Sequence, residues 1–162
     1  MTIPDEVLVL GLGNVLMSDD AAGSLTVARL AASVPAPKGV AFRDGGTIGL
    51  GLLPEINDAA AFIAVDAARF GAVPGTVQVF EGADMDALLC GSKRSAHEVA
   101  LADLMGAAAL QDRLPARRAL VAVEPHSTVL GLAPTSAVHA AIAQMCAEVN
   151  HLLVRWRTKE TP

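Results

Sequence analysis

The stretch that decides the fold is residues 7–20, which read VLVLGLGNVLMSDD. Residues 7–10 form a short and entirely apolar run, which is typical of a strand buried on both faces of a parallel sheet. The glycines in 11–13 end this run, and Ser18 is a good N-cap for a helix with Asp19 and Asp20 in its first turn. A buried strand that passes through a glycine turn into a helix indicates an α/β protein.

The rest of the chain repeats this alternation of apolar, β-branched runs with segments of helical periodicity. The pattern predicts further strands at residues 40–43, 61–65, 77–80 and 119–123, and helices at 50–56, 97–110 and 138–156. Polar and apolar residues alternate at 77–80, as in an edge strand, which is free to run antiparallel. We therefore expect a three-layer α/β/α sandwich, with a twisted, mostly parallel five-stranded sheet and helices on both faces.

Length and charge restrict the classes of function. The 162 residues suffice for one domain, which we place at 1–157, followed by a flexible tail at 158–162. The net charge of −5 and the absence of a basic run argue against nucleic-acid or anionic membrane partners. No apolar stretch reaches about 18 residues and the N-terminus is acidic, so we expect a cytoplasmic protein without a membrane span. A monomer is the default expectation.

Several familiar sites are disfavoured by the motifs that the sequence lacks. Cys90 and Cys146 lie far apart, which argues against a disulfide framework and a thiolate zinc site. Leu16 stands where a dinucleotide fingerprint needs its third glycine, and two aspartates would face the pyrophosphate. The sequence has no G-x-S-x-G elbow, no H-E-x-x-H motif and no phosphate loop.

Acidic residues follow the predicted strands at the points where each strand ends. Asp19 and Asp20 follow the first strand, Asp44 the second and Asp66 the third, and His97 begins a helix that can return to the same edge. Ligands of open α/β sheets bind at this carboxyl edge. Several carboxylates gathered there would repel one another unless a cation lay between them, and carboxylates with an imidazole suit a divalent metal such as Ni or Zn.

Each of these residues also has a plain structural interpretation, which the sequence leaves open. Asp20 could complement the helix dipole, and Asp19 is the more typical helix-starting residue of the two. Asp44 and Asp66 could each serve only in a turn, and a single histidine such as His97 is more often a surface residue than a ligand. His126, His139 and His151 are not expected to be ligands.

Five ordered segments resemble the hydrogenase maturation proteases, the endopeptidases specific for hydrogenases. Residues 11–20 resemble the family's G-x-G-N-x-L-x-x-D-[ED] signature, and 44–47 its D-G-G-T turn. Residues 65–67 resemble the strand end with the second acidic position, 93–97 the loop with the histidine, and 131–134 the segment before the last helix. The resemblance covers nearly the whole chain and implies a mixed five-stranded sheet between helices.

The resemblance also implies an activity, which is removal of a C-terminal extension from the large-subunit precursor of a [NiFe] hydrogenase after nickel insertion. By position, the catalytic and metal-binding residues would be Asp20, Asp66 and His97, although the family often has Glu at the first of these positions. The turn formed by Asp44, Gly45, Gly46 and Thr47 would contact substrate. The nickel would be presented by the precursor, and zinc or another divalent metal could occupy the site in vitro.

Two other classes remain open on the sequence alone. A nickel-binding maturation chaperone would use the same three ligands but would leave the precursor's length unchanged. A nucleotide-binding α/β module would instead use Gly11, Gly13 and Asp44, and NAD or ATP would stabilise it against heat.

Overall fold

The structure is a computed structural model of the whole chain. It describes residues 7–33, 35, 37–46, 49–91 and 96–158, without the side chains of 96–99 and 158. The predicted tail from 159 onward lies outside these residues, while helix α5 continues through Thr158. No helix among the described residues has the length and apolar character needed to cross a membrane.

Five strands form one twisted sheet in the order β2-β1-β3-β5-β4. The strands are β1 (Val7–Leu12), β2 (Val40–Gly46), β3 (Ala61–Ala67), β4 (Val77–Glu81) and β5 (Arg117–Val123). All neighbouring strands pair in parallel except β4, which runs antiparallel to β5 at one edge. The predicted mostly parallel five-stranded sheet is therefore confirmed, and the edge strand expected at 77–80 takes the antiparallel direction that the sequence left open.

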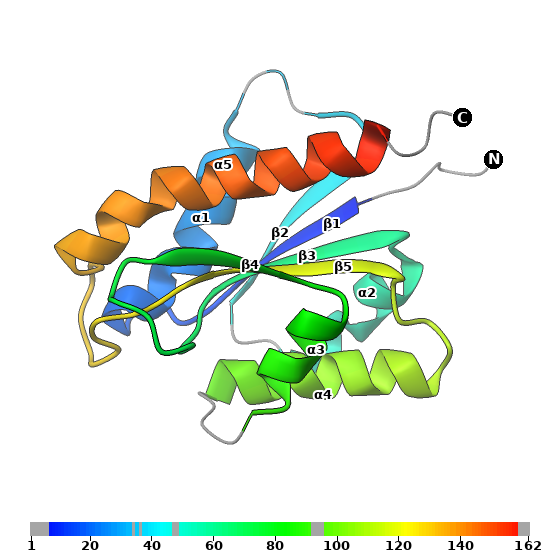
Figure 1. Cartoon of the computed structure of the whole chain (residues 1–162), viewed down its shortest axis with the longest axis horizontal. Helices are drawn as coiled ribbons and strands as arrows, with labels where there is room; N and C mark the ends of the chain where they lie inside the picture. The colour runs from blue at the N-terminus through cyan, green and yellow to red at the C-terminus, as the bar shows by residue number, and fades with distance from the viewer. Residues whose placement is uncertain (1–6, 34, 36, 47–48, 92–95, 159–162) are drawn as a thin grey trace.

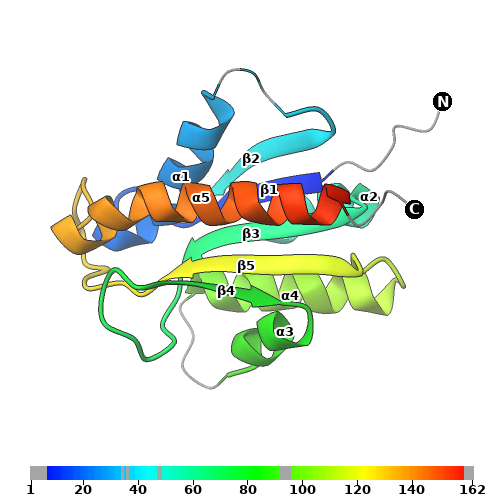
Figure 2. The same ribbon diagram turned by 45° about the horizontal axis from the view of Figure 1, so that its top comes forward.

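Helices cover both faces of this sheet (Figures 1 and 2). Helices α1 (Ala22–Ala31) and α5 (Ser136–Thr158) pack side by side on one face. The other face carries the 3-10 helix η2 (Gly49–Leu52) with helices α2 (Leu53–Asp58), α3 (Ala83–Leu89) and α4 (Ala96–Leu110). The three predicted layers are confirmed, but the helix expected at 50–56 is divided between η2 and α2, and α3 was not predicted.

Two hydrophobic cores follow from the alternation of side chains along the central strand β3. Ile63 and Val65 point to the face covered by α1 and α5, whereas Phe62 and Ala64 point to the face covered by α4. The apolar stripe predicted for the last helix is buried in the first core, namely Val138, Ile142, Met145, Val149, Leu152 and Trp156.

Gly23 near the start of α1 brings the helix into close contact with the ends of two strands. A Cβ atom at this position would lie 2.2 Å from the Val65 carbonyl oxygen and 2.3 Å from that of Leu12. Only glycine permits such an approach of backbone to backbone. The preceding 3-10 helix η1 (Ser18–Ala21) lies against β3, and α1 itself contacts both β1 and β3.

Candidate active site at the carboxyl edge of the sheet

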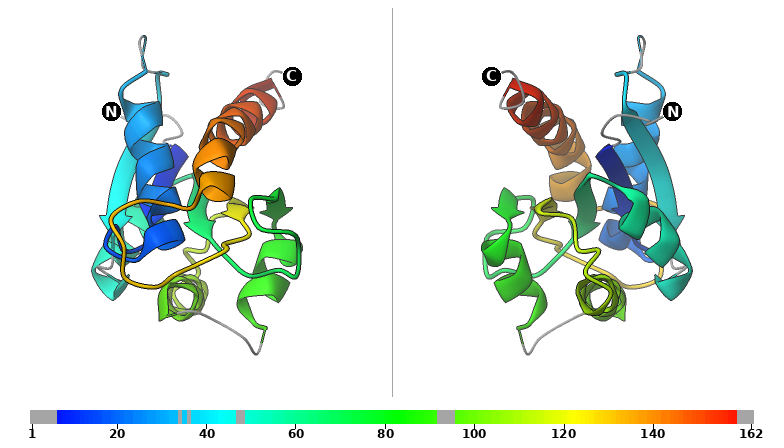
Figure 3. Two further views of the ribbon diagram at one scale, coloured as in Figure 1. Left: turned by 90° about the vertical axis from the view of Figure 1, so that its left-hand side faces the viewer. Right: turned by 90° about the vertical axis from the view of Figure 1, so that its right-hand side faces the viewer.

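Four acidic side chains are buried at the carboxyl edge of the sheet. They are the buried charged residues in the described part of the chain, and they comprise Asp19, Asp20, Asp66 and Glu124. Two come from η1, one from the end of β3, and the last directly follows β5. The left view of Figure 3 looks onto this edge. A concentration of buried acids is unusual in a protein interior and indicates either specific hydrogen bonding or a bound cation.

Asp66 is the predicted ligand that belongs to a strand of the sheet. It is 1% exposed and lies opposite Ala122 of β5. By the alternation along β3, its position shares the α4 face with Phe62 and Ala64. It is therefore not a turn residue, because it continues the strand to Ala67.

Helix α4 brings His97 to the same edge. The helix precedes β5 by a short connection and runs against the strand direction, so it begins where the parallel strands end (Figure 1). His97 is the second residue of α4, and its side chain lies outside the described residues. The structure thus confirms where the histidine enters the fold, and ligation by it stays a prediction.

Asp20 lies in η1 with 6% of its surface exposed. The Asn14 N–H donates to Asp20 Oδ2 at 2.8 Å. This hydrogen bond ties one carboxylate oxygen to the loop that follows β1. The close approach at Gly23 places this loop and the end of β3 together, so Asp20 and Asp66 belong to one edge. The described residues contain no group of three or more His, Cys, Asp or Glu side chains arranged to hold a metal.

Gly13 offers a test of how tightly Asp20 is held. Its φ of +124° is a conformation that other residues avoid, and a Cβ there would lie 1.8 Å from the Asp20 carbonyl oxygen. We expect Gly13→Ala to lower the free energy of unfolding by about 2 kcal/mol or more, measured by urea denaturation. Gly106→Ala, in α4, meets no atom within 4 Å and is the matched control.

Asp19 has a structural role that differs from the helix-starting role expected for it. It is fully buried, and its carboxylate accepts hydrogen bonds from the backbone N–H groups of His126, Ser127 and Thr135 at 2.6–2.9 Å. The Thr135 hydroxyl donates to it as well. Asp19 therefore fastens the loop between β5 and α5 to η1.

These hydrogen bonds decide the pKa of Asp19. Burial alone would raise the pKa, but the three backbone N–H donors and the Thr135 hydroxyl stabilise the charged form. The net result is a pKa lowered from 3.8, so the group is a carboxylate at neutral pH.

Ser18 was predicted as a helix N-cap, and this prediction is wrong. The N-cap position belongs to Met17 and has no side-chain cap hydrogen bond. The Ser18 hydroxyl instead donates to the Val129 carbonyl oxygen at 2.7 Å, so it is a second attachment point of the same loop.

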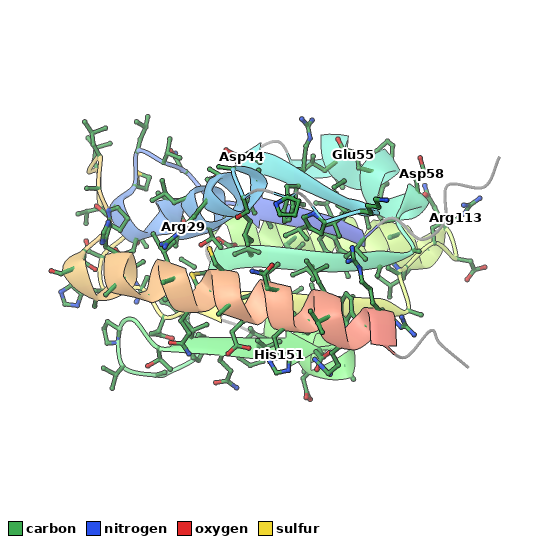
Figure 4. The ribbon with its side chains drawn as sticks, turned by 90° about the horizontal axis from the view of Figure 1, so that it is seen from above. Arg29, Asp44, Glu55, Asp58, Arg113 and His151 are labelled. Carbon is green, nitrogen blue, oxygen red and sulfur yellow. The ribbon has the colours of Figure 1, made fainter. Side chains whose placement is uncertain are left out.

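Residues 44–46 of the D-G-G-T segment lie at the end of β2, beside this edge. Asp44 Oδ1 accepts from the Gly46 N–H at 3.0 Å, which confirms the turn role considered for Asp44, and from the Ser24 hydroxyl at 2.8 Å. Asp44 and Gly46 line a surface pocket of about 210 Å³ together with Ser24 of α1. Figure 4 labels Asp44 beside α1. Thr47 lies outside the described residues, while Gly45 is buried at the end of β2.

Glu124 was missed by the sequence analysis. It is 6% exposed, and its Oε2 accepts from the Phe70 N–H at 2.7 Å. Its position directly after an apolar strand is the signal that identified Asp66, and the same reasoning would have found it. The Phe70 bond ties the segment that follows β3 to the end of β5.

The three remaining histidines and the two thiols are not among the predicted ligands. His126, His139 and His151 are exposed, and Figure 4 labels His151 beside α5. Burial raises the pKa of the Cys146 thiol, which makes it a poor nucleophile at neutral pH. Cys90 is an exposed free thiol.

Several known proteins have a similar sequence. "Hydrogenase expression/formation protein HupD" of Rhodobacter capsulatus is 39% identical over 122 residues, which is 75% of this chain and 58% of that protein. "Hydrogenase 2 maturation protease" of Escherichia coli K12 is 34% identical over 149 residues, 89% of this chain and 90% of that protein. The chain thus spans less than two thirds of the length of the HupD relative.

Solved structures show the same fold. The hydrogenase maturating endopeptidase HybD from E. coli superposes with a TM-score of 0.86 at 31% identity, covering 96% of this chain and 94% of that one. The [NiFe] hydrogenase maturation protease HybD from Thermococcus kodakarensis gives 0.75 at 28% identity, covering 91% and 98%. The sequence model of the family described as "Hydrogenase maturation protease" matches residues 25–151, so this chain belongs to the hydrogenase maturation protease family.

Proposed function

We propose that this chain is an endopeptidase that removes the C-terminal extension of a [NiFe] hydrogenase large-subunit precursor after nickel insertion. Asp20, Asp66 and His97 contact the nickel, which is part of the substrate. The observation that carries the proposal is the placement of two buried carboxylates, from η1 and from β3, at one edge of the sheet where α4 also begins. The proposal places the enzyme in the cytoplasm with its precursor, as a monomer.

The chemistry of the donors supports a substrate metal. Asp20 and Asp66 supply carboxylate oxygens, and an imidazole from His97 would add a nitrogen ligand suited to nickel or zinc. Two or three ligands from the enzyme leave positions for the groups that already hold the metal in the precursor. Zinc or another divalent ion would occupy the same positions in vitro.

A metal presented in this way would report that nickel insertion is complete. The precursor without nickel lacks the ion that the acids attract, so it would bind weakly and be spared. In the loaded precursor, the contact would hold the scissile peptide beside the acids, where an activated water attacks its carbonyl carbon. Asp44 and the turn at 44–47 would contact the peptide at the border of the site.

The names of the relatives support the proposed peptidase activity. The E. coli relative is named as a maturation protease, and the E. coli structure as a maturating endopeptidase. A nickel-binding chaperone would use the same ligands but would not cleave the precursor. Cleavage is therefore the property that distinguishes the two functions.

The decisive experiment is a gel assay of precursor length. We expect the purified chain to shorten nickel-loaded precursor and to leave nickel-free precursor intact, and we expect Asp20→Ala to process it at least about a hundredfold more slowly. Cys90→Ser is the control and should cleave at the normal rate, because that thiol has no role here. Binding of loaded precursor without any change in its length would favour the chaperone instead.

A further inference from the structure

Five large apolar side chains are exposed on two loops at the carboxyl edge of the sheet. We call them the apolar rim, and they are Val15, Leu16, Val129, Leu130 and Leu132, with 48%, 49%, 68%, 78% and 86% of their surface exposed. A single exposed leucine is ordinary, but a contiguous apolar group indicates a binding surface.

The two loops form one surface because backbone hydrogen bonds join them. The Gly131 N–H donates to the Leu16 carbonyl oxygen at 2.8 Å, and the Ser18 N–H donates to the Gly131 carbonyl oxygen at 3.0 Å. Met17 and Gly131 pair as an isolated β-bridge. Figure 3 shows the 125–135 segment running beside the segment that follows β1.

Hydrogen bonds with the buried residues Asp19 and Ser18 fix the loop that carries part of the apolar rim. Asp19 fastens both ends of the 126–135 segment, and the Ser18 hydroxyl fastens Val129 between them. The loops are therefore fixed with their apolar side chains outward, and they cannot fold over to bury them without breaking these bonds.

The apolar rim is continuous with the candidate active site. The loop that carries Val15 and Leu16 leads directly into η1 with Asp20, and Val15 also lines the pocket that contains Asp44. Residues 11–17 and 125–135 contain no Asp, Glu, Lys or Arg. A charged ligand segment would find no partner there, whereas an apolar one would lose unfavourable contact with water.

We propose that the apolar rim docks an uncharged, apolar stretch of the precursor polypeptide close to its scissile bond. The inference rests on the proposed function, since a peptidase must hold the chain that flanks the bond it cuts. Five side chains are too few for a stable interface with a second copy, which needs roughly 20–30 residues on each side. A short segment of the substrate is the occupant that fits a surface of this size.

The test compares two double variants in the processing of nickel-loaded precursor. Leu130→Ser with Leu132→Ser removes the two most exposed side chains of the apolar rim. Leu110→Ser with Val154→Ser removes two other apolar side chains, 90% and 62% exposed, from α4 and α5. We expect the rim variant to raise KM about tenfold or more with kcat unchanged, and the control to change neither. Titration calorimetry should show the same loss in affinity for the precursor, while both variants keep the wild-type melting temperature.

The possible results separate this inference from the proposed function. Wild-type cleavage with an unchanged KM in the rim variant would overturn the docking surface and leave the peptidase intact. Precursor binding that depends on the rim without any cleavage would support the docking surface and reject the peptidase, and no binding at all would reject both. A dimer in sedimentation experiments that the rim variant dissociates would assign the surface to a second copy and overturn the inference.

Discussion

Asp66→Asn is expected to abolish processing of nickel-loaded precursor, with a loss in rate of at least about a hundredfold. The amide matches the carboxylate in shape, so the packing around the end of β3 is retained. It lacks the negative charge that attracts a divalent ion, and amide groups are weak ligands for nickel or zinc. The rate is measured from the loss of the longer precursor band with time.

The controls for this prediction separate chemistry from folding. Asp58→Asn, at the exposed end of α2 and far from the site (Figure 4), should cleave at the normal rate. Circular dichroism should show that Asp66→Asn melts cooperatively, within a few degrees of the wild type. A folded variant that still cleaves at the wild-type rate would remove Asp66 from the site.

The strands and most helices could be predicted because their signals are local. Buried strands such as β3 are short apolar runs, and α5 carries its stripe of apolar residues over 23 residues. Helix α3 was not predicted because it has only 7 residues, two of them aspartates, and buries just Met85 and Leu89. Such a short segment gains its stability from packing rather than from its own sequence.

The carboxylates of the site could be found from the sequence because each lies near the carboxyl end of a strand or in the segment that follows it. The rule that ligands bind where parallel strands end places Asp20, Asp44 and Asp66 at one edge without any knowledge of the packing. The same rule applies to Glu124, which directly follows β5 but was not among the predicted site residues. The binding role of each acid still depends on partners that only the structure or an experiment identifies.

The function of Asp19 could not be predicted, because its partners are distant in the sequence. Its hydrogen bonds join residues separated by 107, 108 and 116 positions, and the bond from Ser18 spans 111. From local sequence both residues resemble the start of a helix. The apolar rim was missed for a related reason, since an apolar loop residue reads as part of the core until the fold shows it exposed.

Asp19→Ala is expected to lower the free energy of unfolding by about 3–5 kcal/mol. The substitution leaves the backbone N–H groups of His126, Ser127 and Thr135 without their acceptor at a partly buried site, and it releases the loop that carries three of the five side chains of the apolar rim. The change is measured by urea denaturation at neutral pH. Asp44→Ala, which removes an exposed aspartate from the same edge, is the matched control and should cost about 1 kcal/mol or less.

The pH dependence gives this prediction a second readout. The folded state lowers the pKa of Asp19 from 3.8, so the stabilisation is fully present above that value and is lost as the pH falls through the folded pKa. The difference in unfolding free energy between wild type and Asp19→Ala should therefore be constant near neutral pH and shrink in acid below about pH 4. A difference of less than 1 kcal/mol at neutral pH would show that the loop is held by its other contacts, and Ser18 would then be the stronger attachment point.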